Sequence, residues 1–417
     1  MRWIILLVTA LFVAGVGVFA LRPPTEEQAP IKVGILHSKT GTMAISEASM
    51  IDAEVMALEE INRQGGILGR PIEWSIKDGE SDWPTYAERA EELITEDGVC
   101  TIFGCWTSAS RKTVKPVVEK HDHLLIYPMA YEGLEQSKNI VYTGAAPNQQ
   151  ITPAVRWSFD NLGKTFFLVG SDYIWPHSVN EIAKDQIKAI GGEVVGEEYL
   201  LLGSTNVDAI VRKIRDTKPA VVLSTVVGDS NLAFYTKLRA AGVDPKTSPV
   251  VSMSIAEDEL RVLPVESMAG NYVAWNYLQG IDRDENREFI KRFRERYGQD
   301  RVTSDVIEAA YFSVYLWAQA VADAESDDTD EVRRAILRQS FNSPEGVVSI
   351  DSTTQHTWKI ICIGQIEPDG SIEVVYQSPK PIRPVPYPVT RSIAEWDAFV
   401  EGLHEKWGGQ WANPGGK

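Results

Sequence analysis

The chain has 417 residues, with 41 Lys and Arg against 58 Asp and Glu, so its formal net charge is −17. This length is enough for two domains of ordinary size. Nucleic-acid binding rests on clustered positive charge, and an acidic chain without a block of Lys and Arg argues against that class of partner. Twelve Trp, fourteen Tyr and regular apolar segments exclude a disordered chain.

The first 22 residues have the features of a signal peptide or an N-terminal anchor. A small or apolar run from Ile4 to Leu21 follows Arg2, and Ala20 ends a Val-Phe-Ala triplet suited to cleavage. At ~1.5 Å per residue the run also reaches across a bilayer, so retention as a membrane anchor stays open. No cysteine follows the run, so a lipid anchor is not indicated. We expect an exported, periplasmic or extracytoplasmic protein with residues 23–30 as a linker.

Export places the three cysteines in an oxidising compartment, which favours disulfides. Cys100 and Cys105 lie in a strand-like run, where ~3.3 Å per residue separates them by about 16 Å, too far for a disulfide. We therefore expect free, mostly buried thiols. A nucleophilic Cys105 would need a base beside it, and the sequence points to no histidine in that role.

Short β-branched runs alternate with helical patterns from residue 31 to residue 253. One helical pattern carries Ile51, Val55 and Leu58 on a single buried face. Because parallel strands need a crossover that can hold a helix, this order predicts an α/β fold with doubly wound sheets. The expected strands are 31–36, 72–76, 100–104, 124–127, 140–143, 166–169, 194–200, 220–227 and 249–253.

The order of elements changes after Tyr272. Three helices are followed by a hairpin whose turn contains Pro368 and Gly370, residues that suit a tight turn. The expected elements are helices at 286–297, 305–323 and 330–339 and hairpin strands at 358–366 and 372–376.

Five prolines between residues 378 and 388 exclude a helix or a central strand there, so we expect this segment to lie extended on the surface. The C-terminal tail, 391–417, contains Trp396, Phe399 and Trp407. Their spacing suggests a short amphipathic segment before a Gly-rich end.

One segment, 59–72, has a helix that ends in Asn62 and two glycines before Gly-Arg-Pro leads into a strand. It resembles the signature of type I periplasmic solute-binding proteins of the branched-chain amino acid and amide group. Further segments are similar to the urea-binding component of ABC transporters and to short-chain amide sensors. The similarity covers about residues 31–390, and its motifs lie at 103–112, 127–133, 142–149, 170–176, 228–234, 252–257 and 355–358.

The resemblance implies two doubly wound, Rossmann-like lobes with a ligand held in the cleft between them. Lobe closure around the ligand would be a hinge motion. It further implies a permease as partner and no cofactor. The expected first lobe is 31–147 with 276–348, the second is 148–275 with 349–390, and the crossovers lie near 146–150, 274–277 and 347–351.

Urea is small, neutral and planar, so a site for it needs hydrogen-bonding groups in its plane and aromatic walls. Loops at the carboxyl ends of parallel strands supply such groups. We expect Ser108 to contribute a hydroxyl, Trp106 and Tyr127 to form walls, and Tyr173 and Trp175 to close over the ligand. The resemblance implies the contact set Trp106, Thr107, Ser108, Tyr127, Met129, Ala130, Tyr131, Tyr173, Trp175, Val227, Gly228, Ser254 and Glu257.

Three departures from the amide sensors favour urea over acetamide. Trp106 and Trp175 stand where the sensors have tyrosines, and Met129-Ala130 replaces a Thr-Pro pair. Glu257 has two interpretations, acceptance from a ligand amino group or capping of the helix that begins there. Asp305 is interpreted as a helix cap.

A urea or amide hydrolase is a second hypothesis. Among the six histidines only His121 and His123 are close in sequence, and they are expected in a solvated surface turn rather than on a metal. Ser171-Asp172 lacks the Gly-x-Ser-x-Gly elbow of serine hydrolases. We therefore expect neither a catalytic set nor a metal.

A cytoplasmic amide-responsive regulator is a third hypothesis, but such a protein has no reason to carry an export signal. The sequence thus favours a solute-binding protein that captures urea and delivers it to a permease. A short-chain amide binding protein or sensor is the alternative.

Overall fold

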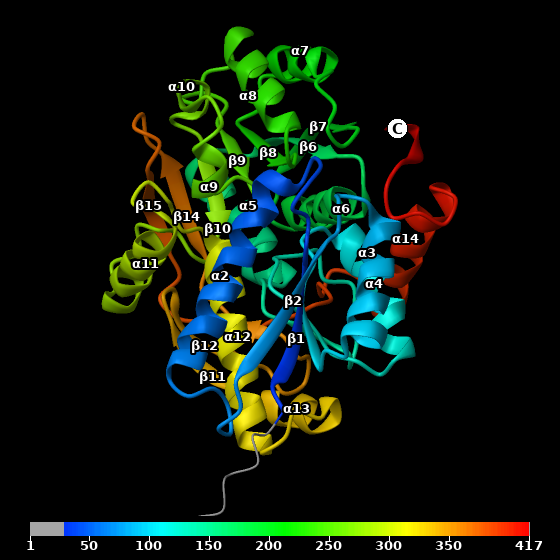
Figure 1. The fold of residues 1–417 in the computed structure, drawn as a ribbon. Helices are drawn as coiled ribbons and strands as arrows, with labels where there is room; N and C mark the ends of the chain where they lie inside the picture. Colours follow the sequence, from blue (N-terminus) through cyan, green and yellow to red (C-terminus); the bar gives the residue numbers. More distant parts are fainter. Residues whose placement is uncertain (1–28, 417) are drawn as a thin grey trace, which may run out of the picture.

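The computed structural model of the protein describes residues 29–416 (Figure 1). The expected signal or anchor at 1–22 and most of the linker lie outside these residues. The first sheet has five strands in the order β2-β1-β3-β4-β5, and every neighbouring pair is parallel. Its strands are β1 (Ile31–His37), β2 (Ile72–Asp78), β3 (Thr101–Gly104), β4 (Leu125–Tyr127) and β5 (Ile140–Tyr142).

The second sheet has seven strands in the order β15-β14-β10-β9-β8-β6-β7. Its central pairs are parallel, whereas β14 runs antiparallel to β10 and forms the expected hairpin with β15. The α/β class and the strands expected between residues 31 and 253 are confirmed. The strands are β6 (Thr165–Ser171), β7 (Glu193–Leu200), β8 (Val221–Thr225), β9 (Val250–Ser252), β10 (Tyr272–Trp275), β14 (Cys362–Ile366) and β15 (Ile372–Gln377).

Helices cover both faces of the first sheet. Figure 1 shows β1 and β2 between α2 and α12 on one side and α3 and α4 on the other. The apolar side chains of β1 and β3 are buried between these layers, as expected for a parallel sheet. The helices of this lobe are α2 (Ala44–Arg63), α3 (Trp83–Glu92) with the π-turn η1 (Leu93–Asp97), α4 (Ser108–Lys120), α11 (Asp284–Tyr297), α12 (Asp305–Ala324) and α13 (Thr329–Ile336).

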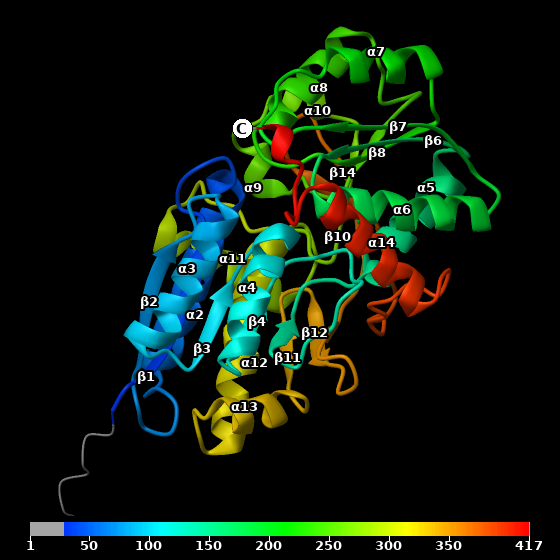
Figure 2. The same cartoon turned by 90° about the vertical axis from the view of Figure 1, so that its right-hand side faces the viewer.

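The second sheet is also sandwiched, with α5 and α6 on one face and α7 and α8 on the other (Figure 2). Two short helices follow β9, and a last helix, α14, packs on α6. The elements are η2 (Pro147–Gln149), α5 (Ile151–Asn161), α6 (Ile174–Ala189), α7 (Asp208–Thr217), α8 (Ser230–Ala240), α9 (Glu257–Leu260), α10 (Val265–Met268), α14 (Ile393–Lys406) and η3 (Pro414–Gly416). Within residues 29–416, no helix has the length and apolar character needed to cross a bilayer.

A small antiparallel sheet, β11 (Ser340–Ser343), β12 (Gly346–Ile350) and β13 (Thr357–Trp358), joins the first lobe. A bridge between Tyr142 and His356 connects it to β5. The chain therefore enters the second sheet only after Trp358. We expected this passage near 347–351, but β12 and β13 first pair with each other, which the sequence pattern did not reveal.

Amide side chains tie the crossovers between the lobes together. Gln150 Nε2 donates to the carbonyl of Ala274 at 2.8 Å, and Asn276 Nδ2 donates to the carbonyl of Gln149 at 3.0 Å. Asp305 Oδ1 accepts from the backbone N–H of Asn276 at 2.9 Å. Asp305 was expected to cap a helix, but its carboxylate holds this crossover and the N-cap position belongs to the preceding serine. These buried bonds fix the hinge region.

The two lobes touch across the cleft. Ser46 Oγ on α2 donates to Glu259 Oε1 on α9 at 2.7 Å. A Cβ built on Gly228 would lie 3.2 Å from the carbonyl oxygen of Thr42, so only glycine fits this approach comfortably. The structure is therefore a closed arrangement of the lobes.

The three cysteines are free, as expected, with Cys105 and Cys362 buried and Cys100 half-buried. The expectation for the histidine pair is only partly right. His121 is half-buried beside Glu91, but His123 is buried and its Nε2 lies 2.8 Å from the carbonyl oxygen of Val99. A packed histidine with a backbone partner, rather than a solvated turn, fills this position.

The close approach of Gly144 to the loop after β4 gives a test of the packing in the first lobe. A Cβ on Gly144 would lie 1.9 Å from the carbonyl carbon of Met129, so the Gly144→Ala variant must displace the loop after β4. We expect a loss of about 1–3 kcal/mol in the free energy of unfolding, measured in guanidinium chloride. Gly402→Ala is the control, because nothing lies within 4 Å and alanine favours a helix interior. Equal stability of the two variants would contradict the packing described.

Candidate functional site

The loops after β3, β4, β6, β8 and β9 meet where the two lobes touch. The residues predicted to contact a ligand are all buried, including Trp106 and Tyr127 of the first lobe and Tyr173 and Trp175 of the second. Burial raises the pKa of Tyr173 well above its ordinary value, and the nearby Tyr127 and Glu132 of the first lobe add to the shift. The tyrosine of one lobe is thus electrostatically coupled to the loop of the other.

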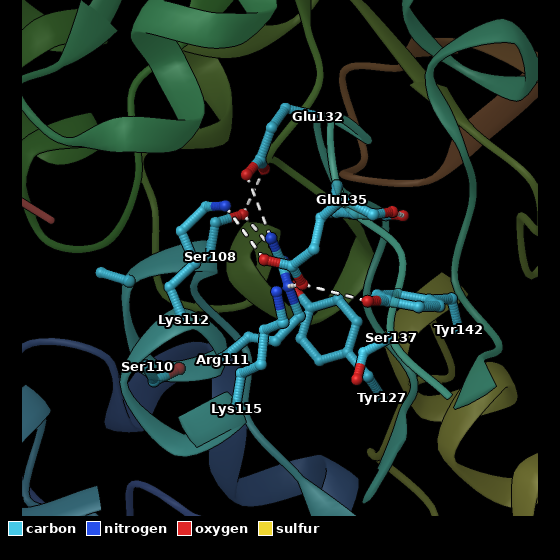
Figure 3. A network of polar contacts seen from close by, with 12 residues as sticks. Ser108, Ser110, Arg111, Lys112, Lys115, Tyr127, Glu132, Glu135, Ser137 and Tyr142 are labelled. Carbon is cyan, nitrogen blue, oxygen red and sulfur yellow. Dashed lines mark hydrogen bonds and ion pairs between the residues drawn. The ribbon is translucent and has the colours of Figure 1, made fainter. Parts of the chain in front are cut away.

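A buried ion network underlies this side of the first lobe (Figure 3). The guanidinium of Arg111, in the first turn of α4, pairs with Glu132 at 3.0 Å and with Glu135 at 3.0 Å. Its third nitrogen, Nη1, donates to Ser108 Oγ at 3.1 Å, and the Ser108 hydroxyl donates in turn to Glu132. Ser108, predicted to contact the ligand, is therefore held by two charged partners.

Further partners complete the network around Glu135. Lys112 Nζ lies 3.0 Å from Glu135 Oε2, and the hydroxyl of Tyr142 donates to Glu135 Oε1 at 3.0 Å. Although burial alone would raise the pKa of Glu135, the cations Lys112 and Arg111 outweigh it and hold the pKa far below its ordinary value. Arg111 and Lys112 are thus both committed to carboxylates of their own lobe.

The aromatic residues pack around this network. The Arg111 guanidinium lies 4.8 Å from the ring centroid of Tyr127 and 4.4 Å from that of Tyr131. The Tyr127 hydroxyl donates to the backbone carbonyl of Trp106 at 2.8 Å, which fixes the loop after β3. A buried cation over two aromatic faces is a favourable arrangement.

Two indole N–H groups stand out among the predicted residues. Trp106 Nε1 and Trp175 Nε1 are both buried, and neither has a hydrogen-bond acceptor among the residues that the structure describes. An unpaired buried donor costs about 1–3 kcal/mol. Trp106 follows β3 of the first sheet and Trp175 opens α6 of the second, so each lobe has one such buried, unpaired donor.

Several predicted residues have structural partners. Thr107 caps α4, since its Oγ1 accepts from the N–H of Ser110 at 3.0 Å. Tyr131 stacks on Tyr142 with ring centroids 5.0 Å apart, below the network. Ser254 Oγ donates to the carbonyl of Val226. These contacts explain their burial without a ligand.

The loop after β8, in the second lobe, makes its contacts through its backbone. The N–H of Val227 donates to Ser171 Oγ at 3.1 Å, and Gly228 has a φ of +63° opposite Thr42. In the first lobe, the backbone of Met129 and Ala130 packs directly on Gly144. Val227, Gly228, Met129 and Ala130 are all buried and have no polar side chain to offer a ligand.

Glu257 lies apart from the other predicted residues. Its Oε1 accepts from the N–H of Gln279 at 2.6 Å, and its Oε2 has no partner among the described residues. It lines a separate cavity of about 380 Å³ together with Gln279 and Val302. The capping role suggested for Glu257 belongs to Glu259, whose carboxylate accepts from the N–H of Ala256 at 2.9 Å.

Sequence reasoning missed the charged part of the site, namely Arg111, Glu132 and Glu135. The signal was present, since Arg111 and Glu132 lie inside motifs quoted for the resemblance, within runs that are otherwise apolar or small. Arg and Glu side chains are almost never fully buried unless they are paired. Arg111 and Glu132 are 21 positions apart in the sequence, so their pairing depends on the fold.

Burial raises the pKa of Cys105, so this thiol is held protonated. Within the described part of the chain, no group of three or more His, Cys, Asp or Glu side chains is placed to hold a metal ion.

Comparisons with known proteins agree with this architecture. The family model described as a periplasmic binding protein domain matches residues 31–393. The chain is 23% identical over 363 residues to Leu/Ile/Val-binding protein homolog 6 of Brucella suis biovar 1 (strain 1330), which is 84% of this chain and 91% of that protein.

A solved structure shows the same fold. The solute-binding protein of an ABC transporter from Rhodopseudomonas palustris BisB5, in complex with 3,4-dihydroxybenzoic acid, is similar with a TM-score of 0.77 and 21% identity, covering 85% of this chain and 98% of that chain. A local match, 31% identical over 145 residues, is to limonene hydroxylase of Geobacillus stearothermophilus. It spans 33% of this chain and only 26% of that protein.

The ion network predicts a large effect of removing its cation. In the Arg111→Met variant Glu132 and Glu135 lose their shared partner in a buried position, so we expect a loss of about 3–5 kcal/mol in stability. Guanidinium chloride unfolding measures it. Arg261→Met, which breaks an exposed pair with Asp300, should cost less than about 1 kcal/mol. A comparable small loss in both variants would show that the buried network contributes little.

Glu257 predicts a pH dependence of stability. Burial raises its pKa from 4.5 to about 8. The folded chain then binds more protons than the unfolded chain between these values, so stability falls as the pH rises from 4.5 to 8. Glu257→Gln should make this decline shallower, whereas exposed Glu266→Gln should leave it unchanged. Thermal melts across this range measure the slope, and an identical slope in all three proteins would refute the assignment.

Proposed function

Because the chain belongs to the periplasmic binding protein domain family and has its type I fold, we propose that it captures urea between its lobes for an ABC transporter permease. In this proposal the protein is exported by its N-terminal segment and binds without turnover. The lobes are those expected from the sequence, with the third crossover moved to residues 359–361. The ligand contacts come from the loops after β3, β4, β6 and β8.

The observation that carries the proposal is the commitment of the buried cations. Each of the three guanidinium nitrogens of Arg111 has a partner among Glu132, Glu135 and Ser108, and Lys112 pairs with Glu135. A carboxylate ligand, such as an amino acid or a benzoate, would need a free positive charge or several spare donors in this dry site. The committed network therefore supports a neutral ligand.

The unpaired indole donors support a small carbonyl compound. Urea has one carbonyl oxygen that accepts hydrogen bonds and two amino groups that donate them. In the proposal its oxygen accepts from Trp106 Nε1 and Trp175 Nε1, and its amino groups donate to Ser108 Oγ and nearby carbonyl oxygens. Tyr127 and Tyr173 supply the aromatic walls. Closed, buried surroundings suit a ligand of a few atoms.

Isothermal titration calorimetry with urea, acetamide, leucine and benzoate tests the proposal. We expect saturable one-to-one binding of urea, weaker binding of acetamide and no binding of the two carboxylates, with urea unchanged after hours of incubation. Tighter binding of acetamide would make the protein a short-chain amide receptor. Binding of leucine or benzoate in preference to urea would overturn the argument from the committed cations.

The indole donors give a second prediction. Trp106→Phe and Trp175→Phe keep an aromatic ring but remove the N–H group, so each should weaken urea binding about two- to tenfold. Trp157→Phe is the matched control, because Trp157 is half-buried on α5 against Tyr272, away from the cleft. Titration calorimetry compares the affinities. Unchanged affinity in both cleft variants would place the ligand elsewhere.

A further inference from the structure

The C-terminal helix α14 is anchored to the second lobe. Arg391, just before it, pairs with Asp185 at 2.8 Å and with Glu181, both on α6. Trp396 is completely buried, and its Nε1 donates to the carbonyl of Pro388 at 2.9 Å. Figure 2 shows α14 lying along α6, and the segment after it passes the upper end of α4 before the chain end turns away. The tail therefore leaves the second lobe from a fixed base.

The segment after α14, residues 408–414, binds the ligand loop of the second lobe. The N–H of Ile174 donates to the carbonyl of Trp411 at 2.9 Å, and the N–H of Asn413 donates to the carbonyl of Asp172 at 3.0 Å. Asn413 Nδ2 also donates to Asp172 Oδ2 at 2.6 Å. These bonds lie on either side of Tyr173 and form an isolated antiparallel bridge between Tyr173 and Ala412.

The same segment reaches the first lobe. Lys112 Nζ lies 4.9 Å from the ring centroid of Trp411, and the same ring stacks on His404 of α14 with centroids 4.1 Å apart. Lys112 belongs to the ion network through Glu135. Trp411 thus links the Arg111 network of one lobe to the base of the tail on the other.

Residues from both lobes and the tail enclose one cavity of about 620 Å³. Trp83, Pro84 and Lys112 of the first lobe face Asp172 and Leu202 of the second across it. The tail covers this side of the cleft. Opening of the lobes must separate Lys112 from Trp411, because the tail is fixed to the second lobe.

We propose that residues 408–414 form a clasp that favours the closed arrangement of the lobes and slows release of the bound ligand. The part concerning release rests on the proposed function, whereas the part concerning closure does not. Trp411 supplies the contact between lobes, and Asn413 fixes the clasp beside Tyr173. An exposed or partly buried cation–aromatic contact is worth enough to change an equilibrium or a rate about two- to tenfold.

The test uses the full chain and the Trp411→Ala variant. With urea as probe, stopped-flow fluorescence should show a release rate about two- to tenfold faster than in the unchanged protein. Without urea, small-angle X-ray scattering should show a larger radius of gyration, because more molecules are open. Trp157→Ala is the matched control, since that half-buried tryptophan lies on one lobe only and should change neither quantity.

A chain ending at Gly408 removes the whole clasp and keeps α14, so it should reproduce the effect of Trp411→Ala. If both variants release urea at the unchanged rate and keep the unchanged radius, the clasp is refuted. If the unchanged protein binds no urea, the proposed function fails, and the scattering comparison alone then decides whether the clasp favours closure. If the variants melt at a lower temperature but keep the unchanged radius of gyration and release rate, residues 408–414 only pack on the second lobe, and the clasp is refuted.

Discussion

Arg111 is the buried charge on which the arrangement of the cleft depends. Its guanidinium joins the start of α4 to Glu132 and Glu135 in the loop after β4, and it lies over the faces of Tyr127 and Tyr131. A buried cation must be paired, so these contacts tie the start of α4 to the loop after β4. The same pairing removes the positive charge that an anionic ligand would need.

Closure of the lobes extends this constraint to the second lobe. The crossovers are tied by Gln150 and Asn276, and Ser46 binds Glu259 directly across the cleft. The indole N–H groups of Trp106 in one lobe and Trp175 in the other are buried and unpaired among the described residues. A hinge-bending protein can use such unsatisfied groups, because a ligand that satisfies them stabilises the closed state more than the open one.

The fold followed from the sequence because its periodicity is strong. Short β-branched runs and helical patterns predicted the strands and helices, and Pro368 and Gly370 predicted the last hairpin. The small sheet at 340–358 was missed, since its strands are short. For the site, the predicted ligand contacts stay a prediction, whereas the bond from the N–H of Gln279 to Glu257 and the stacking of Tyr131 on Tyr142 were not foreseen. Such side-chain partnerships depend on contacts between distant segments, which a single sequence does not display.

A crystal structure of the protein with urea tests the central claim most directly. The account predicts one urea molecule in the cleft, with its oxygen within hydrogen-bond distance of Trp106 Nε1 or Trp175 Nε1, and with Arg111 still paired to Glu132 and Glu135. An empty cleft, or a ligand carboxylate that draws Arg111 away from these glutamates, would contradict it.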